Sequence, residues 1–458
     1  MDVCWVRELG LNAPNPRREA FRILRRVEDA GAFASVLLET RSAEIRDPRD
    51  VALLTEIVLG VLRRRAPLDH AIAKAAARPV DQLDGAVLTA IRIGAYALLY
   101  LDRVPDHAAV DTAVALVKEE GWAKAAGFAN GVLRKIARER SALEPPPPTV
   151  GDIEALALFR SHPGWWTQRV VSRFGWDRSD ALLAANNEPA ATVLAPWPAA
   201  GSAAELGATL AADGVLVAPC RFVPEALRVV SGVPQRTQAF RDGAFWIQDE
   251  ASQLAVRLLG PSVGPTVLDA CAAPGGKTLA LAARAGVDGL VVAADRHALR
   301  LSRLTQNVER LRAENVVALV CDMAKPPPFR GSFDDVLVDA PCSGTGTMRR
   351  HPEIRWRLKP EDLLAHGERQ RRILSAAAGL VRPGGRLVYS VCSIEPEEGE
   401  AVIASFLVEH PEFGRADPSS GLSAAARTKL GEDLALRTSP LDDGMDGFFA
   451  VLLTRRGE

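Results

Sequence analysis

The stretch Val336-Leu337-Val338-Asp339-Ala340-Pro341-Cys342-Ser343-Gly344 joins an apolar run to a polar loop of small residues. The apolar run predicts a buried β-strand, whereas a carboxylate, a thiol and small residues suit the lining of a pocket better than a core. Ligands of α/β sheets bind beyond the carboxyl ends of the strands. This stretch therefore predicts an α/β fold with its chemistry at the end of this strand.

Strands and helices alternate in the sequence on both sides of this stretch. Expected strands cover 266–269, 290–294, 316–320, 335–338, 386–389 and 448–453, and expected helices cover 277–284, 297–312, 360–381 and 397–409. Continuous apolar strands separated by amphipathic helices are typical of a mostly parallel sheet covered on both faces. We expect such an α/β domain over residues 241–458.

Two further regions precede this domain. Residues 1–144 predict an all-α domain with no convincing strand: a helix begins at Pro16, and further helices are expected at 52–65, 68–77, 86–101, 108–119 and 123–138. The four prolines within 145–150 cannot continue a helix and predict an extended linker. Residues 151–240 predict a small α+β domain, with a strand at 192–197, a helix at 203–212 and tryptophans that we expect in its core.

The composition excludes several classes of protein. The 458 residues are 48% hydrophobic and 25% charged with a net charge of −1, so any nucleic-acid surface must be a local patch. The six cysteines include no CxxC pair, so neither a zinc site nor a disulfide framework is expected. Residues 1–8 carry an acid and a base where a signal peptide needs an apolar core. We expect a cytoplasmic monomer that contacts no membrane and holds no metal.

The first strand-to-helix connection of the α/β domain resembles a phosphate loop but departs from it. Gly276-Lys277-Thr278 matches the end of that motif, yet Cys271 stands where the motif needs a glycine. A tight turn remains whose backbone can approach a ligand that has no phosphate, such as S-adenosylmethionine. The candidate cofactor-binding residues are Cys271, Ala272, Ala273, Pro274, Gly275, Gly276 and Lys277. Lys277 either neutralises a cofactor carboxylate or pairs with a neighbour on its helix.

Three successive strands end in a carboxylate, namely Asp295, Asp322 and Asp339. Asp295, after the second strand, can accept hydrogen bonds from ribose hydroxyls. Each carboxylate alone could be a helix cap, but three at matching places indicate a binding site. All three are therefore candidate cofactor-binding residues.

Two cysteines follow the fourth and fifth strands, at Cys342 and Cys392. If these strands are neighbours they lie about 4.8 Å apart, so both thiols flank one substrate; otherwise each is an apolar filler. Carbon 5 of a pyrimidine is barely nucleophilic, and thiolate attack on C6 turns it into an enamine carbon that can accept a methyl group. Asp339 is the nearest acid to assist at N3. The residues alone do not order the two thiols.

Several motifs resemble those of the Sun-type RNA cytosine-C5 methyltransferases. The matching segments are 269–278, 339–346 and 389–398, with weaker matches at 248–253 and 443–449. The resemblance implies a Rossmann-like domain that uses S-adenosylmethionine, with Cys392 as the nucleophile and Cys342 assisting product release. Gly399 departs from the family, which usually has asparagine there.

The amino-terminal domain is similar to the NusB-type RNA-binding domain of the bacterial RsmB branch of this family, through residues 16–20 and 130–134. The resemblance implies methylation of one cytidine in small-subunit (16S) ribosomal RNA. Two alternatives stay open: a tRNA cytosine-C5 methyltransferase, and a non-catalytic RNA-binding factor of ribosome assembly.

A basic segment follows the pocket loop directly. Basic side chains can grip phosphate, and Trp356 among them can stack on a base. The candidate RNA-binding residues are Arg349, Arg350, His351, Arg355 and Arg357. The alternative is a solvated loop. Arg63, Arg64 and Arg65 are weaker candidates, since they also fit an exposed helix face.

Overall fold

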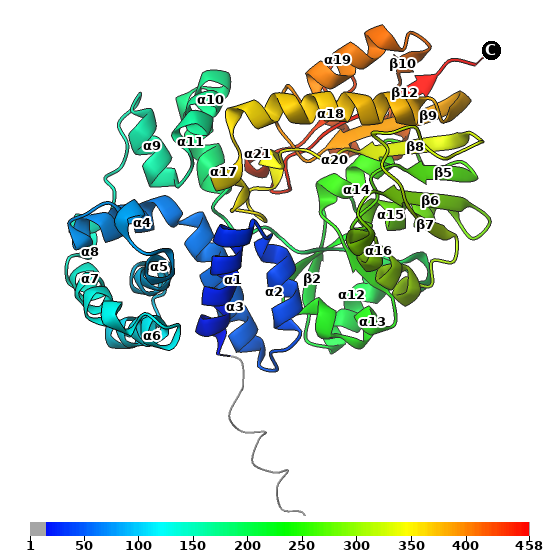
Figure 1. Cartoon of the computed structure of the whole chain (residues 1–458). Helices are drawn as coiled ribbons and strands as arrows, with labels where there is room; N and C mark the ends of the chain where they lie inside the picture. The colour runs from blue at the N-terminus through cyan, green and yellow to red at the C-terminus, as the bar shows by residue number, and fades with distance from the viewer. Residues whose placement is uncertain (1–14, 458) are drawn as a thin grey trace, which may run out of the picture. The chain divides into compact units, whose positions relative to one another are not determined.

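The computed structural model of the chain describes residues 15–457 (Figure 1). Cys4 and residues 1–8, on which the argument against a signal peptide rests, lie outside them. The chain forms two compact units: Met1–Glu188 with Met348–Arg357, and Pro189–Thr347 with Leu358–Glu458. A segment of the carboxyl-terminal half thus belongs to the first unit.

Within the described residues, the first unit is built of helices and contains no strand, which confirms the all-α prediction for the amino-terminal domain. Its helices are α1 (Pro16–Ala30), α2 (Ala34–Ser42), α3 (Pro48–Arg63), α4 (Arg65–Ala76), α5 (Gly85–Tyr100), α6 (Asp106–Glu119), α7 (Ala126–Arg138), α8 (Arg140–Leu143), α9 (Ile153–Arg160), α10 (Gly164–Phe174), α11 (Trp176–Ala185) and α17 (Ile354–Arg357). Helix α5 is buried along most of its length. A Cβ at Gly94 of α5 would lie 2.8 Å from Ala113 of α6, so glycine permits this close helix packing.

The boundary between the units differs from the one expected from the sequence. Helices α9, α10 and α11 group with the amino-terminal helices rather than with the α+β region that follows. Ser161, just after α9, accepts a hydrogen bond from the Ala66 N–H of α4 at 3.2 Å. Trp166 is buried, as expected for a core tryptophan. The proline run therefore separates two sets of helices that share one unit.

The second unit begins with a small antiparallel sheet. Its strands are β1 (Val193–Pro196), β2 (Leu216–Pro219), β3 (Leu227–Ser231) and β4 (Phe245–Ile247), in the order β2-β3-β1-β4. Helices α12 (Ala203–Ala212) and α13 (Gln238–Arg241) accompany it. Leu194, Leu206, Leu210 and Phe245 form its core. The expected α+β character is confirmed, but β4 lies beyond the expected boundary at residue 240.

The main sheet of the second unit is mostly parallel, as expected. Its strands are β5 (Thr266–Asp269), β6 (Leu290–Asp295), β7 (Val316–Val320), β8 (Phe333–Asp339), β9 (Val381–Val391), β10 (Phe413–Arg415), β11 (Leu436–Arg437) and β12 (Phe449–Arg455). The order is β10-β12-β9-β8-β5-β6-β7, with β11 beside β12. Strands β5 to β9 pair in parallel, whereas β12 is antiparallel to β9.

Helices cover both faces of this sheet (Figure 1). Leu337 of β8 packs in one core with α14 (Glu250–Arg257) and α15 (Gly276–Ala285). Its neighbours Val336 and Val338 pack in a second core with α18 (Pro360–Ala378) and α19 (Glu400–Glu409). Successive side chains of a strand point to opposite faces, so an entirely apolar strand needs both layers. Helix α16 (Ala298–Leu311) completes the crossover to β7, and α20 (Ala424–Arg427) and α21 (Pro440–Asp443) lie before β12.

Candidate active site

The two predicted thiols meet at the carboxyl end of the sheet. Strands β8 and β9 are parallel neighbours, with Asp339 opposite Ser390 in the register. The loops that leave these strands bring Cys342 Sγ to 3.1 Å from Cys392 Sγ. Both residues are partly buried and carry free thiols. Parallel pairing therefore places side chains fifty positions apart in the sequence at one point.

The environment of Cys342 favours its protonated form. Its hydrogen bond with Cys392 raises the pKa of the Cys342 thiol well above its ordinary value, and burial adds to the rise. Nearby carboxylates of Glu398 and Asp339 act in the same direction. Cys342 thus retains its proton and can donate a hydrogen bond to the sulfur of Cys392.

Asp339 lies beside the thiols in an ordered ion pair. Lys277 Nζ, from the first turn of α15, is 2.7 Å from Asp339 Oδ2. Ser390 Oγ donates to the other oxygen, Oδ1, at 2.7 Å. Lys277 also lies over the ring of Phe448, 4.8 Å from its centroid. Lys277 thus pairs with a strand-end carboxylate rather than with a neighbour on its helix, and its role toward a cofactor carboxylate stays a prediction.

Asp295 at the end of β6 organises the loop after β5. Its Oδ2 accepts from the Ala273 N–H at 3.1 Å, and its Oδ1 accepts from the His297 N–H at 2.8 Å. Each carboxylate oxygen keeps a further acceptor direction. Arg300 of α16 donates to the Ala273 carbonyl at 2.9 Å. Asp322, after β7, caps its own turn by accepting from the Ala324 N–H at 3.1 Å.

Burial raises the pKa of two groups of the first connection. Burial raises the pKa of the Asp269 carboxyl to about 7, although Thr278 Oγ1 donates to it at 2.7 Å. Burial likewise raises the pKa of the Cys271 thiol well above its ordinary value. Cys271 packs against the core that also contains Leu268 and Ala270. Both groups hold the loop in place, Asp269 through the Thr278 hydroxyl and Cys271 through apolar packing.

Three polar residues near the thiols were not predicted from the sequence. Ser390 orients Asp339, while Glu398 and Gln370 hold the backbone next to Cys342. The segment Tyr389–Glu398 contained Ser390 and Glu398, but a helical Gln at position 370 carries no sign that it faces a strand-end loop. Only the pairing of β8 with β9 and the packing of α18 reveal its role.

The segment predicted to bind RNA instead makes hydrogen bonds within the helical unit. Residues Met348–Arg357 belong to the first unit, where Arg355 is 1% exposed. Arg355 donates to Ser161 O, Asn187 Oδ1, Asn186 O and Met348 O, at 2.7–3.3 Å. The prediction that Arg355 grips phosphate is not supported, because its side chain is buried and protein oxygens accept hydrogen bonds from both of its terminal nitrogens.

Side chains next to Arg355 in the sequence also make contacts within the helical unit. Arg357 donates to the carbonyls of Val27, Gly31 and Ala32, at 2.6–2.8 Å. Burial lowers the pKa of His351 to about 4. Arg349 is buried, and Trp356 donates to Leu62 O at 3.3 Å. Arg350, His351 and Arg357 are partly exposed, and their contact with RNA stays a prediction.

Of the weaker RNA candidates on the helical domain, Arg63 is enclosed in a similar way, whereas Arg64 and Arg65 are partly exposed. Arg63 is buried and donates to the Arg349 carbonyl at 2.9 Å. Arg65 lies over the ring of Trp356, and Arg64 over that of Tyr100. These contacts stabilise the helical unit and leave Arg63 no role as an exposed basic side chain.

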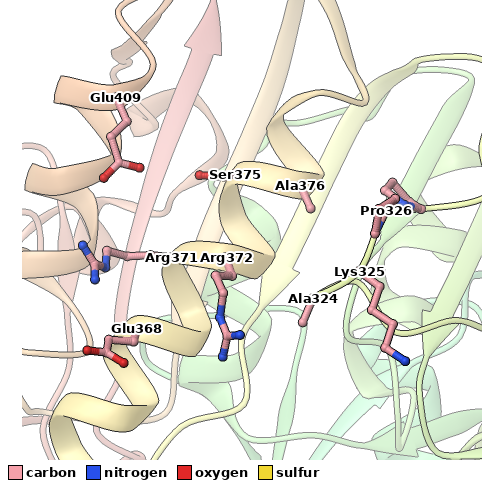
Figure 2. A pocket seen from close by; sticks show the side chains of 10 residues that line it. Ala324, Lys325, Pro326, Glu368, Arg371, Arg372, Ser375, Ala376 and Glu409 are labelled. Atoms are coloured by element: carbon pink, nitrogen blue, oxygen red, sulfur yellow. The ribbon is translucent and has the colours of Figure 1, made fainter.

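An open pocket of about 600 Å³ lies elsewhere in the second unit. Figure 2 shows the side chains that line it. It is lined by the loop after β7 and by α18 and Glu409, and its charged residues carry both signs: Lys325, Arg371, Arg372, Glu368 and Glu409. Its lining residues include neither thiol and none of the strand-end carboxylates. The candidate active site therefore rests on the polar groups that meet at the strand ends.

The part of the chain that the structure describes contains neither a metal-binding cluster nor a membrane-spanning helix. Within residues 15–457, no group of three or more His, Cys, Asp or Glu side chains is arranged to hold a metal ion. Over the same residues, each helix is too short or too polar to span a bilayer.

The doubly covered parallel sheet, with an acid-lined edge and an antiparallel last strand, is the architecture of a Rossmann-like methyltransferase domain. The family described as 16S rRNA methyltransferase RsmB/F matches residues 256–454. The NusB family matches residues 14–138, and a ferredoxin-like domain of RsmF/B-like methyltransferases matches residues 162–236. The three matches cover the three regions expected from the sequence.

Relatives of known name match along the whole chain. One from Bacillus subtilis, named "probable ribosomal RNA small subunit methyltransferase B", is 33% identical over 96% of this chain and 98% of its own length. The ribosomal RNA small subunit methyltransferase B of Vibrio cholerae is 32% identical over the same shares of the two chains. The chain therefore belongs to the RsmB/F family of 16S rRNA methyltransferases.

Solved structures agree with this membership. The crystal structure of PH0851 superposes with a TM-score of 0.82 and 28% identity, covering 97% of this chain and 99% of that chain. A methyltransferase homologue from Pyrococcus horikoshii superposes with a TM-score of 0.58 and 25% identity, covering 67% of this chain and all of that one.

Proposed function

We propose that the protein methylates C5 of a cytidine in 16S ribosomal RNA, with S-adenosylmethionine as the methyl donor and a covalent cysteine–C6 adduct as intermediate. The single observation that carries the proposal is the 3.1 Å approach of Cys342 Sγ to Cys392 Sγ. Transfer to a nitrogen or oxygen with its own lone pair would need no thiol, whereas C5 methylation needs a nucleophile at C6 and a group to complete elimination.

The proposed roles follow from the proton positions. Cys392, as thiolate, attacks C6, and the C5–C6 electrons move toward N3 and the O2 carbonyl. In its protonated form, Asp339 donates a hydrogen bond to N3 and so stabilises the charge on that side of the ring, while Lys277 and Ser390 hold the carboxyl group in place. After methyl transfer a base removes the C5 proton and the Cys392–C6 bond breaks. Cys342, close to Cys392 and poised as a protonated thiol, assists this release.

The residues of the first connection fit S-adenosylmethionine. When bound there, S-adenosylmethionine supplies an electrophilic methyl group. Asp295 retains acceptor capacity for the ribose hydroxyls, and the first N–H groups of α15, at Gly276 and Lys277, suit a carboxylate. Gly275 takes a φ of 113°, which lets the loop turn directly into the helix. Asp322 lies at the end of β7, on the other side of Asp295 from β5.

The test is methylation of deproteinised 16S ribosomal RNA with labelled S-adenosylmethionine, followed by bisulfite sequencing. We expect one cytidine to become bisulfite-resistant with the wild-type chain and no incorporation with Cys392→Ala. Cys342→Ala should instead accumulate a protein–RNA adduct that survives denaturing electrophoresis. Full turnover by Cys392→Ala would refute the covalent mechanism.

Matched substrates address the remaining alternatives. Transfer RNA in the same assay should stay unlabelled. Labelling of transfer RNA but not of 16S RNA would instead identify transfer RNA as the substrate. A non-catalytic assembly factor would bind RNA yet show no heat of S-adenosylmethionine binding in calorimetry. We expect binding that weakens at least tenfold in Asp295→Ala.

A further inference from the structure

A buried carboxylate links the two loops that carry the thiols. Glu398 is 0% exposed, and its Oε1 accepts from the Ser343 N–H at 2.7 Å. Its Oε2 accepts from Ser393 Oγ at 2.5 Å and also from Ser343 Oγ. Ser343 directly follows Cys342, and Ser393 directly follows Cys392. One side chain is therefore bonded to the residue next to each thiol.

Two further residues hold this carboxylate in place. Gln370 Nε2 of α18 donates to Glu398 Oε1 and to the Pro341 carbonyl, each at 3.0 Å. Tyr389 of β9 donates its hydroxyl to the Glu398 backbone carbonyl at 2.5 Å. The loop before Cys342 and the turn after Cys392 are thus tied to the same group from a helix and a strand.

These donors to the Glu398 carboxylate are neutral groups: an amide side chain, two hydroxyls and a backbone N–H. A buried carboxylate costs several kcal/mol unless it is fully hydrogen-bonded, so its donors must be held at fixed positions. Without the carboxylate, the same buried donors would lack their acceptor and the loops would rearrange to satisfy them. The carboxylate and the loops therefore fix each other's geometry.

We propose that Glu398 is a positioning residue that sets the distance between the thiols of Cys342 and Cys392. The inference rests on the proposed function for its consequence, because both thiols must reach one base. A displacement of about 1 Å at a reacting atom can lower a rate about 10²-fold. Glu398 acts through Ser343 and Ser393, whose hydrogen bonds it accepts, rather than on the sulfur atoms themselves.

The distance between the thiols can be tested without RNA. Diamide takes two electrons and two protons from the two thiols, which become a disulfide while diamide becomes the hydrazine. Peptide mapping follows the Cys342–Cys392 disulfide over time. We expect the wild type and Glu400→Gln, which removes a half-exposed partner of Arg437 instead, to react at equal rates. Glu398→Ala should react at least tenfold more slowly.

Charge and geometry are separated by a conservative variant. The Glu398 charge helps to raise the pKa of Cys342, so removal of charge alone would speed the oxidation. Glu398→Gln removes the charge but can still accept the Ser343 N–H and bond both hydroxyls, so it should oxidise at least as fast as the wild type. Slow oxidation only in Glu398→Ala identifies positioning. Oxidation of Glu398→Ala within twofold of the wild type would overturn the proposal.

Methylation supplies the second readout. Glu398→Ala should lower kcat about 10- to 100-fold with KM for RNA within twofold, and Glu398→Gln should restore kcat to within threefold of the wild type. If Glu398→Ala does not fold, Ser393→Ala removes one hydroxyl donor and should slow disulfide formation at least threefold; an unchanged rate would overturn the proposal.

The two proposals fail separately. Inactive wild-type protein with slow oxidation in Glu398→Ala would refute the methyltransferase proposal but not the positioning. Active wild-type protein with an unaltered oxidation rate in Glu398→Ala would refute the positioning proposal but not the methyltransferase proposal.

Discussion

Two polar clusters lie close together in the sequence and differ completely in the structure. The first, Asp339 to Ser343, meets Lys277, Ser390 and Cys392 at the end of the sheet. The second, Arg349 to Arg357, is used inside the helical unit. The side chain of Asp339 is 29% exposed, whereas Arg355 as a residue is 1% exposed. Residue type alone therefore does not determine function. A polar side chain can bind a ligand only if its hydrogen-bonding groups are not already bonded within the protein.

The difference has a physical origin. A strand-end loop cannot pair its polar groups within the sheet, so they converge on the space beyond it. An arginine that follows such a loop carries five donors and can instead satisfy several backbone carbonyls at once. Arg355 and Arg357 do this with carbonyls of the first unit, so the same charge that suggests RNA contact stabilises the protein.

The largest expected effect lies in the first cluster. Asp339→Asn removes the charge that pairs with Lys277 and should lower the methylation rate about 10²- to 10⁴-fold. Initial rates with labelled S-adenosylmethionine measure this, and Ser390→Ala, which loses one hydrogen bond to Asp339, should lose less. Activity of Asp339→Asn within tenfold of the wild type would remove Asp339 from the chemistry.

Asp269 also lies at this edge of the sheet, but we expect its substitution to change the stability of the fold. Burial raises its pKa to about 7 from an ordinary 3.8, so the folded state holds a proton that the unfolded chain releases between these values. Stability therefore falls as pH rises through this window, by up to about 4 kcal/mol. Urea unfolding from pH 4.5 to 7.5 should show a flatter profile for Asp269→Asn. Parallel profiles for the two proteins would contradict this.

Substitutions in the second cluster should lower the stability of the folded protein. Arg355→Ala leaves Ser161 O, Asn186 O and Asn187 Oδ1 without a donor, and should lower the free energy of unfolding by about 3 kcal/mol. Arg49→Ala, at a highly exposed position of the same unit, should change it by less than about 0.5 kcal/mol.

RNA affinity distinguishes the two interpretations of Arg355. Removing one ion pair between an arginine and an RNA phosphate reduces the salt dependence of log K by roughly 0.7–0.9. We expect no change of this slope in Arg355→Lys, measured by filter binding at a temperature where the variant is folded. A reduced slope with unchanged stability would restore Arg355 to the RNA surface.

The smallest effect is expected at Gly399, where the chain departs from the Sun-type pattern. An added Cβ would lie 2.9 Å from the Phe449 ring, whereas an asparagine in place of glycine at this helix N-cap would gain only about a few tenths of a kcal/mol. Because Phe449 is buried, Gly399→Asn should lower the free energy of unfolding by about 1 kcal/mol, with methylation unchanged. Increased stability in urea unfolding would show that Phe449 can move aside.

Much of the catalytic domain could be predicted from local sequence. The strands at 266–269, 290–294 and 316–320 recur in the structure, because apolar runs of this length have few other stable uses. Helix α2 escaped prediction, since its apolar residues are too few to set a period. The grouping of α9 to α11 with the first unit also escaped prediction, because it depends on contacts with α4 that local patterns do not encode.

Local sequence was enough to predict the class of fold and to single out the two thiols and the three strand-end carboxylates, because strand periodicity and the polar residues after each strand are local properties. The tertiary structure decided that Cys342 and Cys392 touch, that Lys277 pairs with Asp339, and that Glu398 links the two loops. It also decided that Arg355 is enclosed. Such contacts join residues far apart in the chain, and only the pairing of strands and the packing of helices fix which of them meet.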